Sequence, residues 1–252
     1  AQFTYDFQEV VLTYGNSIAA KHNTKLLWVD LHATNPAMQQ YDWCKVSVSL
    51  INTTFYKATK PEYMTATESN QTIVNDSDKD LTSTPVLKYS VTNDHTFTIL
   101  TALKQANSFN LNLNLGDIIS IGIGDTITEE VDFQTTQAQS HTETSDSESS
   151  ATFTIPPHQK RKFYALVQKV TFSTGFNASL KISGCAALWF QDKILDHYLM
   201  FQSVQEIVNN VSSIDPSQIT VYKSDSTGVN FTAKGIVQVV YGYNSTIEAE
   251  NV

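Results

Sequence analysis

Two stretches of strictly alternating apolar and polar residues, joined by Gly116-Asp117, constrain the fold of this chain more than any other feature. Within residues 106–128 the first arm alternates apolar side chains with asparagines, and the second alternates isoleucines with serine and glycine. Alternation with a period of two is typical of β-strands with one apolar and one polar face, and Gly-Asp favours a turn. Pairing Leu115 with Ile119 across a short loop brings the apolar sides of both arms onto one face. The stretch therefore predicts an amphipathic β-hairpin.

The spacing alone leaves two interpretations of this hairpin open. Each arm has about nine residues, which is the length that a tilted strand needs to cross the hydrocarbon of a bilayer. A hairpin in a soluble β-sandwich has the same pattern, because it buries one face in the core and leaves the other in water. The rest of the chain has to decide between a membrane-inserting hairpin and a core hairpin.

The composition favours exposed strands over exposed helices. Charged residues make up 16% of the 252 residues, below the average of about 25%. Ser, Thr and Asn take their place and give long polar faces without charge, which suits strands better than helices. The net charge of −9 argues against nucleic acid as a partner and against general adsorption to anionic lipid. Contact with a membrane then requires a specific receptor or the insertion of apolar side chains.

Sequence motifs for catalysis are missing. The sequence contains neither GxSxG nor HExxH nor a phosphate-binding loop, and its six histidines are scattered. We therefore expect a protein that is not an enzyme and that uses no cofactor and no metal. Cys44 and Cys185 either form one disulfide or remain two buried thiols. With no visible signal peptide and no apolar run of about 20 residues, we expect a protein made in soluble form.

Patterns elsewhere predict mostly strands, with short helices near 6–14 and 192–209. The Thr- and Ser-rich tract 135–155 is predicted to be a long solvent-exposed strand that ends at Pro156-Pro157, because β-branched residues favour strands and proline stops them. Further strands are expected at 25–31, 43–50, 163–172, 178–182 and 229–243.

Four aromatic residues in the first quarter of the chain form a candidate receptor-binding set. Such residues usually pack in the core or at its rim, and alternatively they form a binding patch for a sugar or a lipid headgroup. The candidates are Tyr41, Trp43, Tyr56 and Tyr63.

Three pieces of sequence occur in a characteristic order. Residues 93–97 (Asn-Asp-His-Thr-Phe) lead into an alternating strand, and the amphipathic segment 107–128 follows between Ser/Thr-rich strands. Residues 155–162 (Ile-Pro-Pro-His-Gln-Lys-Arg-Lys) then begin a strand that ends near Gly184. In this order the pieces resemble the aerolysin-like β-pore-forming toxins, in the branch with epsilon toxin and mosquitocidal toxin. The compact size suggests the small animal members, such as the cnidarian hydralysins.

The resemblance implies an all-β fold with few short helices, built as an elongated aerolysin-like arrangement of long twisted antiparallel strands. It implies a head or receptor-binding lobe made of residues 1–85 plus about 186–225. An elongated pore-forming and oligomerisation module comprises residues 86–185 plus about 226–252 and contains the 106–128 hairpin.

The implied function is that of a secreted pore-forming cytolysin. Such a protein is a soluble monomer that binds a receptor on a target-cell membrane, assembles into a ring homo-oligomer of heptamer type and inserts a transmembrane β-barrel. The receptor is a glycan, a lipid or a glycoprotein. The alternative is a non-lytic β-sandwich lectin or adhesin that binds cell-surface glycans and keeps its hairpin buried permanently.

The resemblance also assigns roles along the hairpin by the parity of each position. The membrane-inserting side chains are expected to be Phe109, Leu111, Leu113, Leu115, Ile118, Ile119, Ile121 and Ile123. The pore-lining positions are expected to be Asn110, Asn112, Asn114, Ser120, Gly122, Gly124, Glu130 and Asp132. Because Glu130 and Asp132 carry negative charge toward the water, the pore is expected to have a mild preference for cations.

Overall fold

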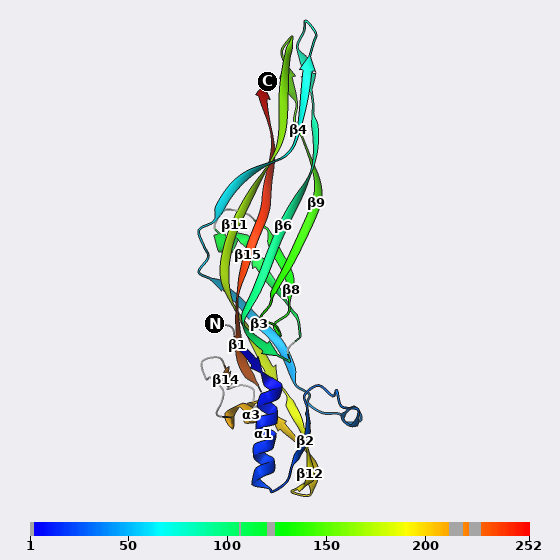
Figure 1. Cartoon of the computed structure of the whole chain (residues 1–252), viewed down its shortest axis with the longest axis vertical. Helices are drawn as coiled ribbons and strands as arrows, with labels where there is room; N and C mark the ends of the chain where they lie inside the picture. The colour runs from blue at the N-terminus through cyan, green and yellow to red at the C-terminus, as the bar shows by residue number, and fades with distance from the viewer. Residues whose placement is uncertain (1–2, 106, 120–123, 212–218, 222–227) are drawn as a thin grey trace.

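The computed structural model describes residues 3–105, 107–119, 124–211, 219–221 and 228–252, and it has the elongated form shown in Figure 1. Strands make up most of it, which confirms the predicted all-β fold with few short helices. The elements are, in chain order, β1 (Phe3–Asp6), α1 (Phe7–Lys21), β2 (Leu26–Asp30), the 3-10 turn η1 (Pro36–Met38), β3 (Ser47–Tyr56), β4 (Glu62–Asn75), β5 (Leu81–Ser83), β6 (Val86–Lys104), β7 (Phe109–Asn114), α2 (Leu115–Ile119), β8 (Thr126–Val131), β9 (Ala138–Ser150), β10 (Phe153–Ile155), β11 (Gln159–Ser183), β12 (Cys185–Ile194), β13 (His197–Ser203), α3 (Val204–Asn209), β14 (Ile219–Val221) and β15 (Val229–Asn251).

A long twisted sheet with the strand order β1-β6-β15-β11-β3 forms the body of the molecule. Its longest strand, β11, pairs with β15 over residues 161–182. On its other side β11 pairs with β4 through residues 159–171 and with β3 through residues 175–183. The 25 residues of β11 span roughly 80 Å at about 3.3 Å per residue. These long continuous strands account for the elongated shape in Figure 1.

The apolar side chains of β11 fall into two cores. Up to Val167 the buried side chains of this strand lie at odd positions, and from Val170 onward they lie at even positions. The register with β15 shifts between Gln168 and Lys169, and such an irregularity changes which parity faces a core. A small upper core therefore contains Phe163 and Val167, whereas the main core contains Val170 and the buried positions after it.

Helix α1 is longer than the predicted 6–14 helix. Asp6 caps its start, because its carboxylate accepts hydrogen bonds from the backbone N–H groups of Gln8 and Glu9 at 3.1 and 3.3 Å. The sequence suggested a stop at Gly15, but the helix continues to Lys21. A Cβ atom at Gly15 would lie only 2.7 Å from the Leu26 side chain. Gly15 therefore allows α1 to pack closely on β2 rather than ending the helix.

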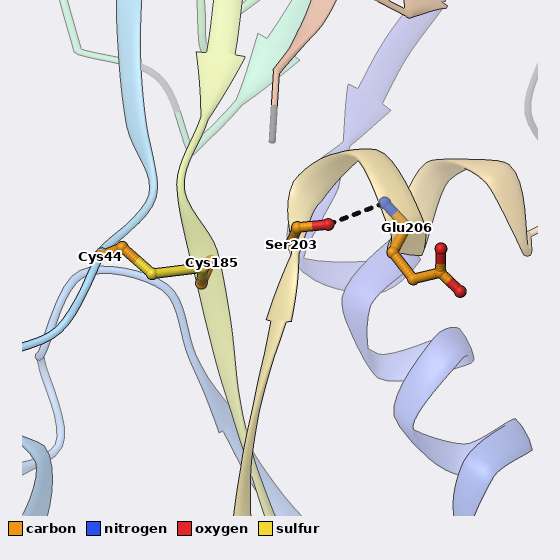
Figure 2. The surroundings of a disulfide bond; sticks show 4 residues. All are labelled: Cys44, Cys185, Ser203 and Glu206. Carbon is orange, nitrogen blue, oxygen red and sulfur yellow. Dashed lines mark hydrogen bonds between the residues drawn. A yellow bond between two sulfur atoms is a disulfide. The ribbon is translucent and has the colours of Figure 1, made fainter. Parts of the chain in front are cut away.

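The predicted 192–209 helix is wrong. The region forms the β12–β13 hairpin, and only residues 204–209 are helical, as α3. The apolar side chains of this stretch suggested a helical period, but Leu195 and Asp196 adopt positive φ angles and reverse the chain instead. The helix begins at Ser203, whose hydroxyl accepts a hydrogen bond from the backbone N–H of Glu206 at 3.1 Å, as Figure 2 shows. The Ser-x-x-Glu spacing is a capping-box signal.

Cys44 and Cys185 form a disulfide, which settles the question that the sequence left open. Figure 2 shows the bond joining the segment before β3 to the start of β12. Gly184, with φ +93°, precedes the bond, and a Cβ atom there would lie 2.2 Å from the Lys45 carbonyl oxygen. Only glycine fits this close approach. The disulfide fixes the small β13-β12-β2 sheet to the end of the long sheet.

Two other expectations can be compared with the fold. The tract 135–155 contains the exposed strand β9, as predicted, but the predicted single strand up to Pro156 is wrong, because residues 153–155 form the separate strand β10, which pairs with β5. The division into a head and a pore-forming module stays a prediction; β3 and β4, from the first 85 residues, pair with β11, which that division places in the second unit. Among the described residues, no helix is both long enough and apolar enough to cross a membrane.

Candidate functional site

The predicted amphipathic segment lies on the long sheet as β7, α2 and β8. It is amphipathic as expected, but the expected pairing is wrong, because Leu115 and Ile119 are the two ends of α2 rather than a cross-strand pair. β7 pairs with β8 in a register that places Leu113 opposite Ile127. The second arm therefore begins at Thr126, several residues later than the sequence suggested.

A helical turn takes the place of the expected tight turn and buries the apolar side chains at both of its ends. Leu115 and Ile119 are four positions apart, so a single α-turn places both on one face, and both are buried. The Asn114 side chain accepts a hydrogen bond from the backbone N–H of Gly116 at 3.2 Å and so supports the start of the turn. At the other end, the N–H of Leu115 donates to the carbonyl of Asp125 at 3.1 Å.

The apolar face of the segment is part of the main core. Leu111, Leu113 and Leu115 have no exposed surface, and they share one cluster with side chains of β6, β11 and β15. Phe109 and Ile118 are half-buried at the edge of that cluster. The described side chains that the sequence assigned to lipid are thus all sheltered from water to some degree in this form. Ile121 and Ile123 lie outside the described residues.

The polar face of the segment points away from the core. The expected pore-lining residues Asn110, Asn112, Asn114, Gly124 and Glu130 are exposed, and Asp132 is half-buried. Ser120 and Gly122 lie outside the described residues. A groove of about 580 Å³ separates Asn112, Asn114 and α2 from the end of β3. On this side, therefore, the segment is not packed tightly against the sheet.

A second, smaller and polar cleft lies between β8 and strands β6, β9 and β15 of the sheet. Glu129 of β8 lies between two histidines: its carboxylate is 3.3 Å from Nδ1 of His141 on β9 and 4.0 Å from Nδ1 of His95 on β6. His95 is 2% exposed, and within the described part of the chain neither of its ring nitrogens has a hydrogen-bond partner. Burial lowers the pKa of His95, although the Glu129 carboxylate opposes that effect.

The same cleft contains a second polar contact to the segment. The Tyr241 hydroxyl of β15 donates a hydrogen bond to the carboxylate of Asp125, which comes just before β8. Burial, together with this hydrogen bond, raises the pKa of Tyr241 to about 12. The segment is thus attached to the sheet by a buried apolar face and by polar contacts at Asp125 and Glu129.

The strands that flank the segment are direct neighbours. β6 pairs with β9 from Val86 opposite Ser150 to Thr98 opposite Ala138. The chain between β6 and β9 therefore connects two strands that are neighbours in one antiparallel pair. Figure 1 shows β6, β9 and β8 side by side on one flank of the molecule.

Comparison with known proteins identifies the family. Residues 34–252 match the family described as Clostridium epsilon toxin ETX/Bacillus mosquitocidal toxin MTX2. The chain belongs to this toxin family. No curated protein matches the sequence of this ETX/MTX2-family chain.

Several solved structures share the fold of this chain. A non-toxic crystal protein from Bacillus thuringiensis superposes with a TM-score of 0.70 at 12% identity, covering 100% of this chain and 98% of that one. The parasporin-2 toxin of Bacillus thuringiensis, which recognizes cancer cells, gives 0.54 at 16% identity, covering 97% and 94%. The β-pore-forming protein Mpp75Aa1.1 from Brevibacillus laterosporus gives 0.54 at 13%, covering 99% and 90%. Because one of these relatives is described as non-toxic, the shared fold does not by itself make a chain lytic.

The four aromatic residues suggested as a receptor-binding set do not form one patch in this ETX/MTX2-family chain. Trp43 packs on Phe201 with ring centroids 5.3 Å apart, beside the disulfide, whereas Tyr63 contacts Tyr243 of β15. Tyr63 is paired with β11 at position 170, and Cys44 is bonded to Cys185 beyond its end, so Trp43 and Tyr63 lie roughly 50 Å apart at about 3.3 Å per residue.

Tyr56 and Tyr41 complete the predicted set. Tyr56 pairs with position 175 of β11, between the two sites just described. Tyr41 is 41% exposed, in the loop after η1. Trp43 lies against the β13-β12-β2 sheet through its contact with Phe201, and the same sheet also carries the stacked rings of Trp28, Trp189 and Tyr198. The sequence held a signal for these rings, since the apolar stretches 26–29 and 185–190 each contain a tryptophan.

Proposed function

We propose that this chain is a secreted, non-enzymatic cytolysin that docks on a target-cell membrane, assembles into a ring and inserts residues 106–128 of every copy into one shared β-barrel. The ring is expected to be of heptamer type. In this proposal docking belongs to the end with α1, β2, β12 and β13, and barrel formation belongs to the β6–β9 region. Family membership supports the general function; the sequence of steps rests on the geometry of the segment.

The observation that carries the proposal is the register of two neighbouring ladders. Continuing the β6–β9 ladder beyond Thr98 and Ala138 pairs Asn112 with Gly124 and centres the turn on Ile118. In the present form Asn112 is paired with Thr128 instead. The two registers differ by four residues, an even number, so every side chain keeps its face when one register changes into the other. The segment can therefore extend the β6–β9 pair into one long hairpin whose sides remain apolar and polar.

The energetics indicate why insertion needs an oligomer. Moving Leu111 or Leu113 from the protein core to lipid changes its environment little, because both surroundings are apolar, so the burial of about 1.5–3 kcal/mol per side chain is kept rather than gained. The backbone is different, because a single hairpin leaves two unpaired edges in the hydrocarbon. Closing a barrel with neighbouring copies removes those edges. Release of the segment is thus favourable only within a ring.

A pair of engineered disulfides tests this change of register. Asn112→Cys/Thr128→Cys joins two exposed, paired residues whose side chains are 2.7 Å apart, and it fixes the present β7–β8 register. The matched control Thr92→Cys/Thr144→Cys joins an equivalent pair of the β6–β9 ladder, 3.3 Å apart, which keeps its register in the proposed pore.

We expect the oxidised β7–β8 variant to bind cells but to lose release of a trapped dye, and mild reduction to restore that release. The oxidised control variant should release dye normally. An unheated detergent gel should show a stable oligomer for every variant that lyses. Lysis by the oxidised β7–β8 variant would contradict the proposed register change. Binding without lysis by the unmodified protein, on several cell types, would favour the lectin alternative.

A further inference from the structure

The turn between β12 and β13 exposes an apolar side chain in an unfavourable backbone conformation. Leu195 and Asp196 have φ angles of +48° and +68°, so both central residues are left-handed. Asn and Gly are the usual residues of such turns, because a larger side chain collides with the backbone there. Leu195 is nevertheless 82% exposed. Neither its backbone conformation nor its exposure stabilises the folded chain, which points to a role outside the fold.

A row of aromatic rings lies behind this turn and crosses all three strands of the β13-β12-β2 sheet. Trp28 stacks on Trp189 with centroids 5.4 Å apart, and Trp189 stacks on Tyr198 at 6.4 Å. The Nζ atom of Lys193 lies 5.5 Å from the centre of the Tyr198 ring. Tyr198 is 43% exposed and the two tryptophans are half-buried. The surface therefore passes from an exposed leucine, through a lysine and a tyrosine, to partly sheltered indoles.

We propose that this end of the molecule binds directly to a zwitterionic phospholipid bilayer. Leu195 enters the boundary of the acyl chains, and Tyr198 and the tryptophans lie at the level of the headgroups, where amphipathic aromatic rings are stabilised. The proposal deepens the proposed function, on which it rests for the role of the contact, by naming the surface and the lipid class of the first docking step.

The charged side chains beside Leu195 favour a zwitterionic lipid headgroup over an anionic one. Lys193 and Asp196 lie on either side of Leu195 and are both exposed, as is Asp192, whose carboxylate accepts a hydrogen bond from the Thr24 hydroxyl. Lys193 and Asp196 thus place a cation and an anion beside the leucine. This pair complements a phosphocholine headgroup, which carries a phosphate and an ammonium group. An anionic surface would attract Lys193 but repel Asp196 and the chain's net charge of −9. The position agrees with a docking role, because β12 lies at one extreme end of the molecule in Figure 1.

The three tryptophans of the chain provide a built-in probe. Trp28, Trp43 and Trp189 all contact the β13-β12-β2 sheet or belong to it, and the sequence contains no other tryptophan. Vesicles of phosphatidylcholine with brominated acyl chains should therefore quench the intrinsic fluorescence of the full-length protein. Sedimentation with unbrominated phosphatidylcholine vesicles measures the partition coefficient independently.

Leu195→Asn is the decisive variant. It removes the apolar group while placing a residue that favours the left-handed conformation, so it preserves the turn. We expect the partition coefficient to fall about tenfold, as for the loss of one buried leucine. The control Val74→Asn changes a side chain of β4 that is 52% exposed and that pairs with Lys160, at the end of β11 remote from β12, and it should not alter binding. Leu195→Met, which keeps an apolar group, should retain most of the affinity.

The outcomes separate this inference from the proposed function. Quenching and sedimentation that depend on Leu195 support lipid docking even if no dye is released, and absence of lysis would then count only against pore formation. Equal binding by Leu195→Asn and the unmodified protein would overturn the inference. So would failure to bind phosphatidylcholine vesicles together with cell binding that is abolished by protease or glycosidase treatment, because the receptor would then be a glycoprotein.

Discussion

The β6–β9 and β7–β8 pairs are successive parts of the same stretch of chain, yet they are stabilised in opposite ways. Each residue of β9 is exposed or half-exposed, and its ladder with β6 relies on backbone pairing and on hydroxyl contacts such as that of Thr96 with Ser140 at 3.1 Å. In β7, by contrast, Leu111 and Leu113 are completely buried, while its ladder with β8 spans only 109–114.

The contrast indicates which part of the chain is able to change. A ladder that depends on its own backbone hydrogen bonds can keep its register in water, so β6–β9 is suited to be a permanent base. A short ladder that depends on the core of the monomer loses its support when that core is exchanged for lipid. The four predictions that follow test this contrast, from the largest expected effect to the smallest.

The largest expected difference between the β7–β8 and β6–β9 pairs is in the loss of unfolding free energy when one side chain is truncated. Leu111→Ala, at a position with no exposed surface, should lower the free energy of unfolding by about 3 kcal/mol, through lost burial and the cavity left behind. Thr144→Ala on exposed β9 should change it by less than about 0.5 kcal/mol. Urea denaturation monitored by circular dichroism measures both. Equal effects would mean that β7 contributes no more to the core than β9 does. The variant Leu113→Asp is unsuitable for this comparison, because a charge at this buried position would unfold the monomer.

Removal of the tyrosine contact should loosen β8 alone. Tyr241→Phe deletes the hydrogen bond to Asp125, at a cost of about 1 kcal/mol, and should speed amide exchange in β8 about fivefold while leaving β6–β9 unchanged. Because the folded-state pKa of Tyr241 is about 12, above the ordinary value of about 10, the contact is complete below pH 10 and is lost as the pH rises through 12. The control is Tyr243→Phe on the same strand. Uniform acceleration in all strands would contradict a local role.

Acid should weaken the contact of β8 with the β6–β9 ladder. The pKa of buried His95 is lowered by its burial, so the unfolded or undocked chain binds a proton more readily than the folded one. Stability from this site is therefore present above the ordinary histidine pKa of about 6.5 and decreases as the pH falls through the folded-state value. The groups that face His95 are Glu129, His141, Glu143 and Asp94.

Amide exchange of β8 measured at several pH values tests this dependence. His95→Phe keeps a ring in the buried site and removes the titrating group, so the extra exchange at acid pH should diminish. A variant at the exposed His22, at the end of α1, serves as the control and should retain the full pH dependence. An unchanged pH dependence in His95→Phe would show that titration of His95 is not its cause.

The smallest expected effect concerns the ions that pass through the proposed pore. Glu130 is exposed on the polar side of β8 and shares its parity with Asp132. Glu130→Gln should reduce the mild cation preference without altering lysis, as measured by reversal potentials in planar bilayers under a salt gradient. Anion selectivity of the unmodified pore would rule out the assignment of this face to the water-filled channel.

Much of this fold could be predicted because the signals are local. Alternation marked the strands around the 106–128 segment, β-branched residues marked the exposed tract that contains β9, and the order of three pieces led to the family. The capping box at Ser203 was equally local, but it was obscured by apolar residues at Leu195 and Tyr198 whose spacing imitates a helix. Such short apolar runs do not distinguish a helix from a hairpin.

Parity along the hairpin was a property of the sequence, because the side-chain period of a strand is fixed at two by its backbone geometry. Register was not. Burial of Leu115 and Ile119 against other strands favoured a helical turn, and that turn moved the partner of Leu113 to Ile127. Likewise, only the folded chain brings Cys44 to Cys185, across 141 positions of sequence, and only it sets Leu195 at an exposed end. Alternation is set by residues that are adjacent in the sequence. Register, disulfide pairing and exposure depend instead on which residues, distant in the sequence, pack against one another and exclude water.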